Sequence, residues 1–261
     1  MTELAPLQLR FSHEELVTVL ELLELPMIAG VGKEPFGDMS PKFVSLLKQV
    51  GLRSLLARGI VEMNSDGQAV VDEHLTKLLF LCAYPQKILT IIWQEDDEHA
   101  RVEHVYRVPD LAIAHGQIYP GVHELIVFET DNDLLAGRLL ERLPCSDSIS
   151  GEKSFPLSRQ DFDHIQNRSS RIALIAQLSS MGVDGKTTES FAEAIQAGST
   201  RLLIETSRQD REQVSRENKT FLISPESCWL LDGLADPDCT SISVVPLSST
   251  AFKQQLLSLL R

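Results

Sequence analysis

The sequence predicts an α+β protein with two quasi-repeated halves, each made of helices, then an antiparallel sheet, then a closing helix. Apolar residues first recur at helical spacing and then change to the two-residue period of strands, and this order occurs twice. A Ser-, Gly- and Asp-rich stretch between the two patterns predicts a linker at residues 146–157. The expected halves are therefore residues 1–145 and 158–261, and their shared order indicates a diverged duplication.

The first helix has a clear start. Ser12 and Glu15 have the spacing of a capping box, and Phe11 and Leu16 are placed for a hydrophobic staple. Apolar residues then follow at helical spacing up to Pro26, where the helix is expected to end.

A second helix is predicted to start at Ser40-Pro41, with proline at its first position, and to stop at Gly59. Residues 60–71 then read as a two-stranded hairpin, and Asp72 is placed to cap a third helix. Residues 40–85 together predict a winged-helix-like element. Phe43, Leu47 and Val50 form one apolar stripe of the second helix, which Leu55 continues.

The remaining elements follow from the change of period. A helix is expected at the end of each half, from Asp131 in the first and over residues 252–260 in the second. In the second half, one long helix is expected from Ser158 to about Leu178, followed by a helix over residues 188–197. The predicted strands are residues 89–95, 101–108, 111–118, 123–130, 201–207, 220–224, 228–231 and 241–247.

The charge balance restricts the expected partners. The chain carries a net charge of −13, of which residues 1–145 hold 22 acidic and 12 basic side chains. No cluster of Lys and Arg offers a phosphate-binding patch, so nucleic acid is not an expected partner. The acidic balance favours a basic or neutral protein partner. The N-terminal ten residues lack a signal-peptide pattern and no apolar run is long enough for a membrane span, so a cytoplasmic location is expected.

Two groups of residues are candidates for chemical sites. His99, His104, His115 and His123 lie in the first predicted sheet with Glu103 and Glu124, and such residues can bind a metal. Surface histidines, or sheet histidines with satisfied hydrogen bonds, are the more ordinary interpretation. Asp96, Asp97 and Glu98 next to His99 offer paired carboxylates, although a charged hairpin tip is usually a solvated turn.

No other pattern supports catalysis. The sequence contains no Gly-x-Ser-x-Gly elbow and no phosphate-binding P-loop, and none of its four cysteines lies in a recognised catalytic signature. We therefore expect a protein that is not an enzyme and that has no cofactor or metal.

A winged-helix regulatory protein is the alternative to be kept open. A helix that ends in Ala57-Arg58-Gly59 before a hairpin is typical of many DNA-binding winged domains. The hairpin region carries Glu62, Asp66 and Asp72 but no basic residue before Lys77, and this charge opposes phosphate contacts. A structural or protein-binding role for the element fits this charge better.

An apolar sheet face is the candidate protein-binding site. Trp93 and Ile91 lie in the first predicted strand and Tyr106 lies in the next, and aromatic residues often anchor protein interfaces. If helices cover this face, the same residues belong to the core.

The order of elements resembles the EspG family of type VII secretion chaperones. The residues that carry the resemblance are Leu55-Leu56-Ala57-Arg58-Gly59-Ile60, Asp66-Gly67, Tyr84-Pro85 and Arg142-Leu143-Pro144. The resemblance implies a cytosolic, non-enzymatic, quasi-two-fold α+β protein that binds the tip of a helical secretion substrate of PE–PPE type.

The sequence departs from that family in one loop and in the region between the halves, which is shorter here. The family uses a long, partly apolar loop between sheet strands for substrate binding, whereas residues 95–100 form a short acidic turn here. The expected partner is therefore a secreted helical protein, either PE/PPE-like or a simpler Trp-x-Gly type hairpin.

Overall fold

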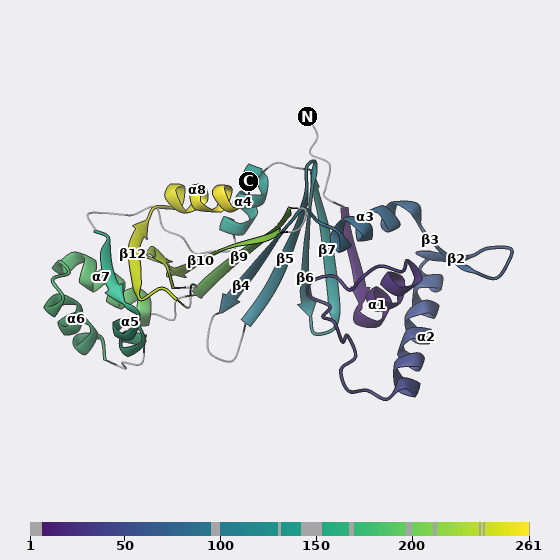
Figure 1. Cartoon of the computed structure of the whole chain (residues 1–261), viewed down its shortest axis with the longest axis horizontal. Coiled ribbons are helices and arrows are strands. Elements are labelled where there is room, and N and C mark those ends of the chain that lie inside the picture. Colours follow the sequence, from purple (N-terminus) through teal and green to yellow (C-terminus); the bar gives the residue numbers. More distant parts are fainter. Residues whose placement is uncertain are drawn as a thin grey trace. The chain divides into compact units, whose positions relative to one another are not determined.

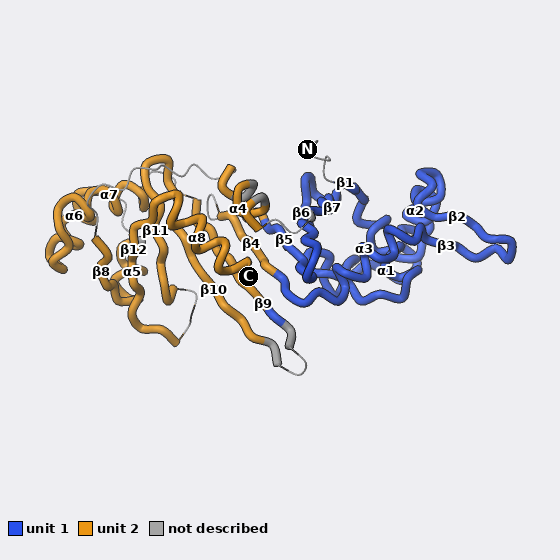
Figure 2. Tube along the Cα trace, turned by 90° about the horizontal axis from the view of Figure 1, so that it is seen from above, with its two compact units in different colours: residues 1–88, 102–130, 208–214 blue, residues 89–101, 131–207, 215–261 orange. Residues whose placement is uncertain are grey.

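The predicted α+β class is confirmed by the computed structural model, which combines a large antiparallel sheet with helices (Figure 1). The structure describes residues 7–94, 100–129, 132–141, 153–166, 170–196, 200–210, 213–234, 236 and 238–260. The chain divides into two compact units (Figure 2). Unit 1 comprises residues 1–88, 102–130 and 208–214, and unit 2 comprises residues 89–101, 131–207 and 215–261. The predicted division into halves at the linker, and the duplication, remain predictions.

Unit 1 contains β1, β7, β6 and most of β5, which are neighbouring antiparallel strands in this order. Their bounds are β1 Leu7–Ser12, β5 Ala100–Val108, β6 Leu111–Tyr119 and β7 Val122–Glu129. Strand β1 was not predicted, although Leu7, Leu9 and Phe11 alternate with polar residues. It is stabilised by pairing with β7, where Leu9 lies opposite Leu125, and such a distant partner leaves no local signal.

The helices of unit 1 are α1 (His13–Leu22), α2 (Pro41–Ala57) and α3 (Glu73–Ala83). Helix α1 lies in the core, where Leu16, Val17, Val19 and Leu20 have no exposed surface. The predicted capping box of Ser12 and Glu15 is confirmed. The helix ends four residues before Pro26, because Glu24 adopts a left-handed backbone conformation (φ 52°).

The predicted hairpin is confirmed as strands β2 (Val61–Met63) and β3 (Ala69–Val71). The carbonyl oxygen of the Asn64 side chain accepts hydrogen bonds from the backbone N–H groups of Asp66 and Gln68, and Gly67 supplies the positive φ of 74° that the turn requires. Asp72 caps α3 through the N–H groups of His74 and Leu75, as expected. The classification of this region as a winged helix remains a prediction.

Unit 2 contains most of β4, β9 and β10 together with β11, β12 and β8, in the strand order β4-β9-β10-β11-β12-β8. These strands are β4 (Lys87–Gln94), β8 (Phe155–Ser158), β9 (Thr200–Asp210), β10 (Gln213–Ile223), β11 (Cys228–Asp232) and β12 (Ser241–Leu247). The helices are α4 (Asn132–Glu141), α5 (Arg159–Gln166), α6 (Arg171–Ser180), α7 (Gly185–Gln196) and α8 (Ser249–Leu260). The rings of Phe155, Phe191 and Trp229 pack edge to face at the centre of its core.

Two predictions for unit 2 were wrong. Residues 155–157, which were assigned to the linker, belong to strand β8, whose residue Leu157 pairs with Ile242 of β12. The long helix expected from Ser158 is divided into α5 and α6, and Ser170 directly before α6 has an extended backbone (φ −116°, ψ 119°). Ile165 is fully buried, whereas Ile172, two turns further on, has 81% of its surface exposed.

No helix among the described residues is long and apolar enough to cross a membrane.

Candidate functional site

Helix α2 is fixed at its C-terminal end by a buried carboxylate. The guanidinium of Arg58, the residue that caps α2, lies 2.7 Å from Glu15 Oε2 and also donates to the carbonyl oxygen of Arg10 at 2.7 Å. Ser54 Oγ donates to Glu15 Oε1 at 2.6 Å. The Ala-Arg-Gly helix end therefore uses its arginine inside the protein, where the guanidinium also lies over the ring of Phe11.

The ionised form of the Glu15 carboxyl group is stabilised although the group is buried. Burial by itself raises the pKa of this carboxyl group, whereas hydrogen bonds from Ser54, the Ser12 N–H and Arg58 lower it. With the added charge of Arg58 they hold the pKa of Glu15 below its ordinary value. Glu15 is therefore ionised at neutral pH and joins α1 to the end of α2.

The middle of α2 approaches α1 at a glycine. A Cβ atom at Gly51 would lie 2.6 Å from the carbonyl oxygen of Glu14 and 2.7 Å from Thr18 Oγ1. Both distances are shorter than real side chains tolerate, so only glycine allows the two helices to pack this closely. Gly51 and Leu55 are the buried residues of α2, and the rest of the helix is partly or fully exposed.

The exposed side of α2 carries an apolar stripe, formed by Phe43, Leu46 and Val50. Their exposed fractions are 48%, 51% and 50%, so about half of each side chain is in contact with solvent. Helical geometry places the three residues within an arc of about 60°. We call these three residues the α2 stripe.

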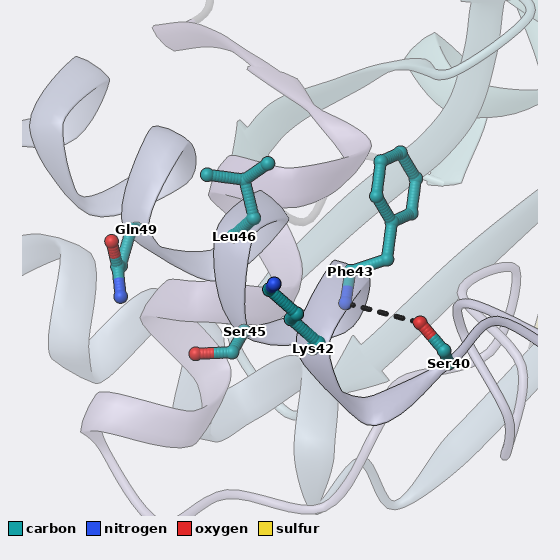
Figure 3. A pocket seen from close by; sticks show the side chains of 6 residues that line it. All are labelled: Ser40, Lys42, Phe43, Ser45, Leu46 and Gln49. Atoms are coloured by element: carbon teal, nitrogen blue, oxygen red, sulfur yellow. Dashed lines mark hydrogen bonds between the residues drawn. The ribbon is translucent and has the colours of Figure 1, made fainter.

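A shallow hollow of about 450 Å³ lies along the α2 stripe (Figure 3). The helix starts there at Ser40, whose Oγ accepts a hydrogen bond from the N–H of Phe43. A second hollow of about 750 Å³ lies between α1 and α2, and Ser45 and Gln49 line both hollows. The residues that line the first hollow are Ser40, Lys42, Phe43, Ser45, Leu46 and Gln49.

The charge of α2 differs from that of the whole chain. The helix contains Lys42, Lys48 and Arg53 and no acidic residue, in a protein with a net charge of −13. Lys48 forms an ion pair with Glu21 of α1 at 2.6 Å, whereas Lys42 and Arg53 lie on the exposed side. The α2 stripe is therefore bordered by positive charge.

The predicted binding residues Trp93, Ile91 and Tyr106 are all buried. Ile91 has no exposed surface, Trp93 retains 7% and Tyr106 retains 1%. The guanidinium of Arg101 lies 5.5 Å from the centre of the Trp93 ring. This burial favours the core interpretation of these residues, and their role in partner binding remains a prediction.

Tyr106 belongs to a chain of hydrogen bonds on the inner face of β5, β6 and β7. Its hydroxyl group donates to the carbonyl oxygen of Ala29 at 2.6 Å and lies 3.0 Å from His115 Nδ1. Burial raises the pKa of Tyr106 well above its ordinary value, so the hydroxyl keeps its proton.

The chain continues through two more histidines. His115 Nε2 lies 2.9 Å from His123 Nδ1, and His123 Nε2 lies 3.0 Å from His13 Nδ1. His13 Nε2 then lies 2.7 Å from the carbonyl oxygen of Pro35. Both ends of the chain are thus carbonyl oxygens of the segment that joins α1 to α2.

The number of protons follows from these contacts. One hydroxyl and three neutral imidazoles hold four hydrogens, but the five contacts each need one. All five are hydrogen bonds only when one imidazole carries a second proton. Burial strongly lowers the pKa of His115, to about 3, and that of His123, to about 4.

The hydrogen-bond chain involves two of the histidines that the sequence offers as metal ligands. His115 and His123 use their ring nitrogens in the chain, His104 lies beside His115 at 6.2 Å between ring centres, and Glu124 accepts from Gln8 and Arg10. Within the described ranges, no three His, Cys, Asp or Glu side chains are grouped so that they could hold a metal ion. The second candidate site, the acidic turn of residues 96–99, lies outside the described residues.

Sequence reasoning missed the α2 stripe. Phe43 and Val50 were predicted to share one stripe with Leu47 and Leu55, but of these four only Leu47 and Leu55 pack in the core. The sequence does contain a pattern that predicts this stripe. Phe43, Leu46 and Val50 are spaced three and four residues apart, in a helix without acidic residues.

Comparisons with known proteins support the fold. No protein-family model matches the sequence, and no curated protein matches it either. The structure is similar to that of the Mycobacterium tuberculosis type VII secretion system chaperone EspG5, solved in complex with the PE25-PPE41 dimer. The TM-score is 0.66 at 10% sequence identity, and the similarity covers 97% of this chain and 96% of EspG5. The chain therefore has an EspG-like fold.

Proposed function

We propose that the chain is a non-enzymatic chaperone or adaptor that binds a helical secretion substrate of a type VII-like system. The observation that carries this proposal is the similarity of fold to EspG5 over nearly the full length of both chains. That protein is a chaperone in complex with a PE–PPE dimer, and a PE/PPE-like partner is accordingly the first candidate here. A Trp-x-Gly type hairpin is the second candidate, and a cytosolic location is part of the same proposal.

The surface of α2 supports a binding role. A chaperone has to present apolar surface that its substrate can cover, and the α2 stripe is such a surface. The regulatory alternative has less support, because Arg58 is used in the ion pair with Glu15 instead of being presented to a phosphate.

Co-purification from the native cell tests this function. The tagged protein is expressed at its natural level, and the proteins that elute with it are identified and quantified by mass spectrometry. We expect a small, helical, secreted protein at near-equal stoichiometry, and an unrelated tagged protein from the same cell serves as the control. Elution with DNA or with a transcription complex would instead favour the winged-helix alternative.

A further inference from the structure

We propose that the α2 stripe docks an acidic amphipathic helix of another protein. This inference rests on the proposed function and deepens it, because it names the chemistry of the partner and the surface that receives it. It combines three observations on the described residues: an exposed apolar stripe, a hollow lined by two of its residues, and basic residues at its border.

The spacing of the α2 stripe is that of a helix contact. Phe43, Leu46 and Val50 stand three and four residues apart, which is how one helix presents apolar residues to another. Phe43 and Leu46 line the first hollow, which gives side chains of a second helix space beside the stripe.

The charge of the face selects an acidic partner. Lys42 and Arg53 border the α2 stripe near its two ends, and α2 contains no carboxylate to neutralise them. Glutamate or aspartate residues of a docked helix would lie within a few ångströms of these cations. At that distance local charges decide the contact, because salt screens more remote charges beyond about 8 Å. The expectation of a basic or neutral partner, which came from the net charge, therefore does not apply to this face.

A second copy of this chain fits the face poorly. An antiparallel pair of α2 helices centred between Leu46 and Val50 would place Lys42 of one protomer near Arg53 of its partner. A parallel pair would place Lys42 near Lys42. Like charges in contact disfavour both arrangements, so the occupant is a different protein.

Two stapled helical peptides of about 20 residues provide the probe, a length that gives roughly five helical turns. Both carry leucine at positions i, i+3 and i+7, and they differ only in having either glutamate or lysine beside the leucines. Binding to the full-length chain is measured by fluorescence anisotropy at low and high salt. We expect the glutamate peptide to bind at least about tenfold more tightly than the lysine peptide, and to weaken as salt increases.

Substitutions locate the binding surface. Leu46→Asp should weaken the glutamate peptide by about tenfold or more, because it places a charge at the centre of the stripe. The matched control is Ile172→Asp, which changes an exposed apolar residue on helix α6 of unit 2 and should leave binding unchanged. Circular dichroism establishes that both variants are folded. Combining Lys42→Glu with Arg53→Glu should reverse the preference, so that the lysine peptide binds more tightly.

The outcomes separate this inference from the proposed function. Equal binding of the two peptides, or unchanged binding by a folded Leu46→Asp variant, would overturn the inference. Self-association of the wild type that Leu46→Asp abolishes would also overturn it, in favour of a second copy. If a secreted helical protein co-purifies equally well with the Leu46→Asp variant, the proposed function stands and the α2 stripe is not its binding surface.

Discussion

At the residue scale, Glu15 connects a helix start to a helix end. Its carboxylate accepts from Ser12, Ser54 and Arg58 while 3% of the residue is exposed. Glu15→Gln keeps the shape but removes the charge that Arg58 pairs with. We expect unfolding to become easier by about 1–3 kcal/mol, measured by urea denaturation at pH 7.

A neighbouring glutamate provides the control for this prediction. Glu14 lies in the same first turn of α1 and is partly exposed, and Glu14→Gln should cost less than about 0.5 kcal/mol. The pKa of Glu15 is lowered by folding, so its contribution is present above the unfolded value of 4.5 and is lost as the pH falls below it. Equal stability losses in the two variants would contradict the role assigned to Glu15.

The buried side chains of His115 and His123 predict a second dependence of stability on pH, in a higher pH range than that of Glu15. Burial lowers the pKa of His115 from 6.5 to about 3 and that of His123 from 6.5 to about 4. The unfolded chain therefore takes up protons below pH 6.5 that the folded chain does not. Stability should be full above pH 6.5 and fall by about 1.4 kcal/mol per pH unit for each imidazole as the pH decreases towards 4.

Urea denaturation between pH 7 and pH 5 measures this slope. His123→Gln should reduce the slope, because one of the two titrating imidazoles is removed. His164→Asn is the control, because His164 is exposed on α5 and its removal should leave the slope unchanged. A wild-type slope near zero over this range would show that the buried histidines do not oppose protonation.

Substitution of Trp93 distinguishes a role in the core from a role in partner binding. With 7% of its surface exposed, we expect Trp93→Asp to destabilise the chain by about 3–5 kcal/mol or to unfold it, as seen by thermal denaturation. Trp93→Phe keeps an apolar ring and should cost less. A folded Trp93→Asp variant that fails to bind the partner would instead support the predicted binding role.

Some residue contacts could be predicted from the sequence and others could not. The bond between Ser12 and Glu15 joins residues three positions apart, so spacing alone predicts it. The bonds from Glu15 to Arg58 and from His13 to His123 join residues 43 and 110 positions apart. These contacts depend on how α1 packs against α2 and the sheet, and spacing carries no information on that.

At the element scale, Gly51 fixes the distance between α1 and α2. Gly51→Ala should favour an isolated helix by up to about 1 kcal/mol. We nevertheless expect a net destabilisation of about 1–3 kcal/mol by urea denaturation, because the new methyl group meets the backbone of Glu14 at 2.6 Å.

Gly137 offers the matched control for this prediction. It lies within helix α4, and a Cβ atom there has no neighbour within 4 Å. Gly137→Ala should therefore stabilise the chain by about 0.5–1 kcal/mol. Stabilisation by both substitutions would show that α1 and α2 are not in close contact at Gly51.

The elements that the sequence predicted well are those with local signals at both ends. Helix α2 begins at Ser40-Pro41 and ends before Gly59, and α3 begins after Asp72, as expected. Strands β1 and β8 were missed because each is short and is held by a partner strand from a distant part of the chain. The exposed face of α2 was misjudged for a similar reason, since both stripes of that helix are apolar and tertiary packing selects which one is buried.

At the scale of the whole molecule, the order of elements was sufficient to predict the fold class. The similarity to EspG5 at 10% identity shows the same principle, because the arrangement of elements is kept while most side chains differ. The candidate site could not be predicted in this way. Exposure of the α2 stripe is a property of the folded chain, and neither composition nor net charge describes it.

The net charge predicts the solubility of the chain. The charge of −13 at neutral pH keeps molecules apart, and it approaches zero near the pI of about 5.0. We expect light scattering to show a minimum of solubility near that pH. Material that returns to pH 7 with an unchanged circular dichroism spectrum has associated without unfolding, which separates this effect from the loss of stability caused by the histidines.

The α2 stripe has a further consequence for the evolution of this protein. Phe43, Leu46 and Val50 are about half exposed, whereas the packing of α2 depends on Gly51, Leu55 and Arg58. Mutations in the first set alter a surface while the second set preserves the fold. Under the proposed docking role of the α2 stripe, related chains can change their binding partner through a few substitutions on a single helix, with little cost to the stability of the fold.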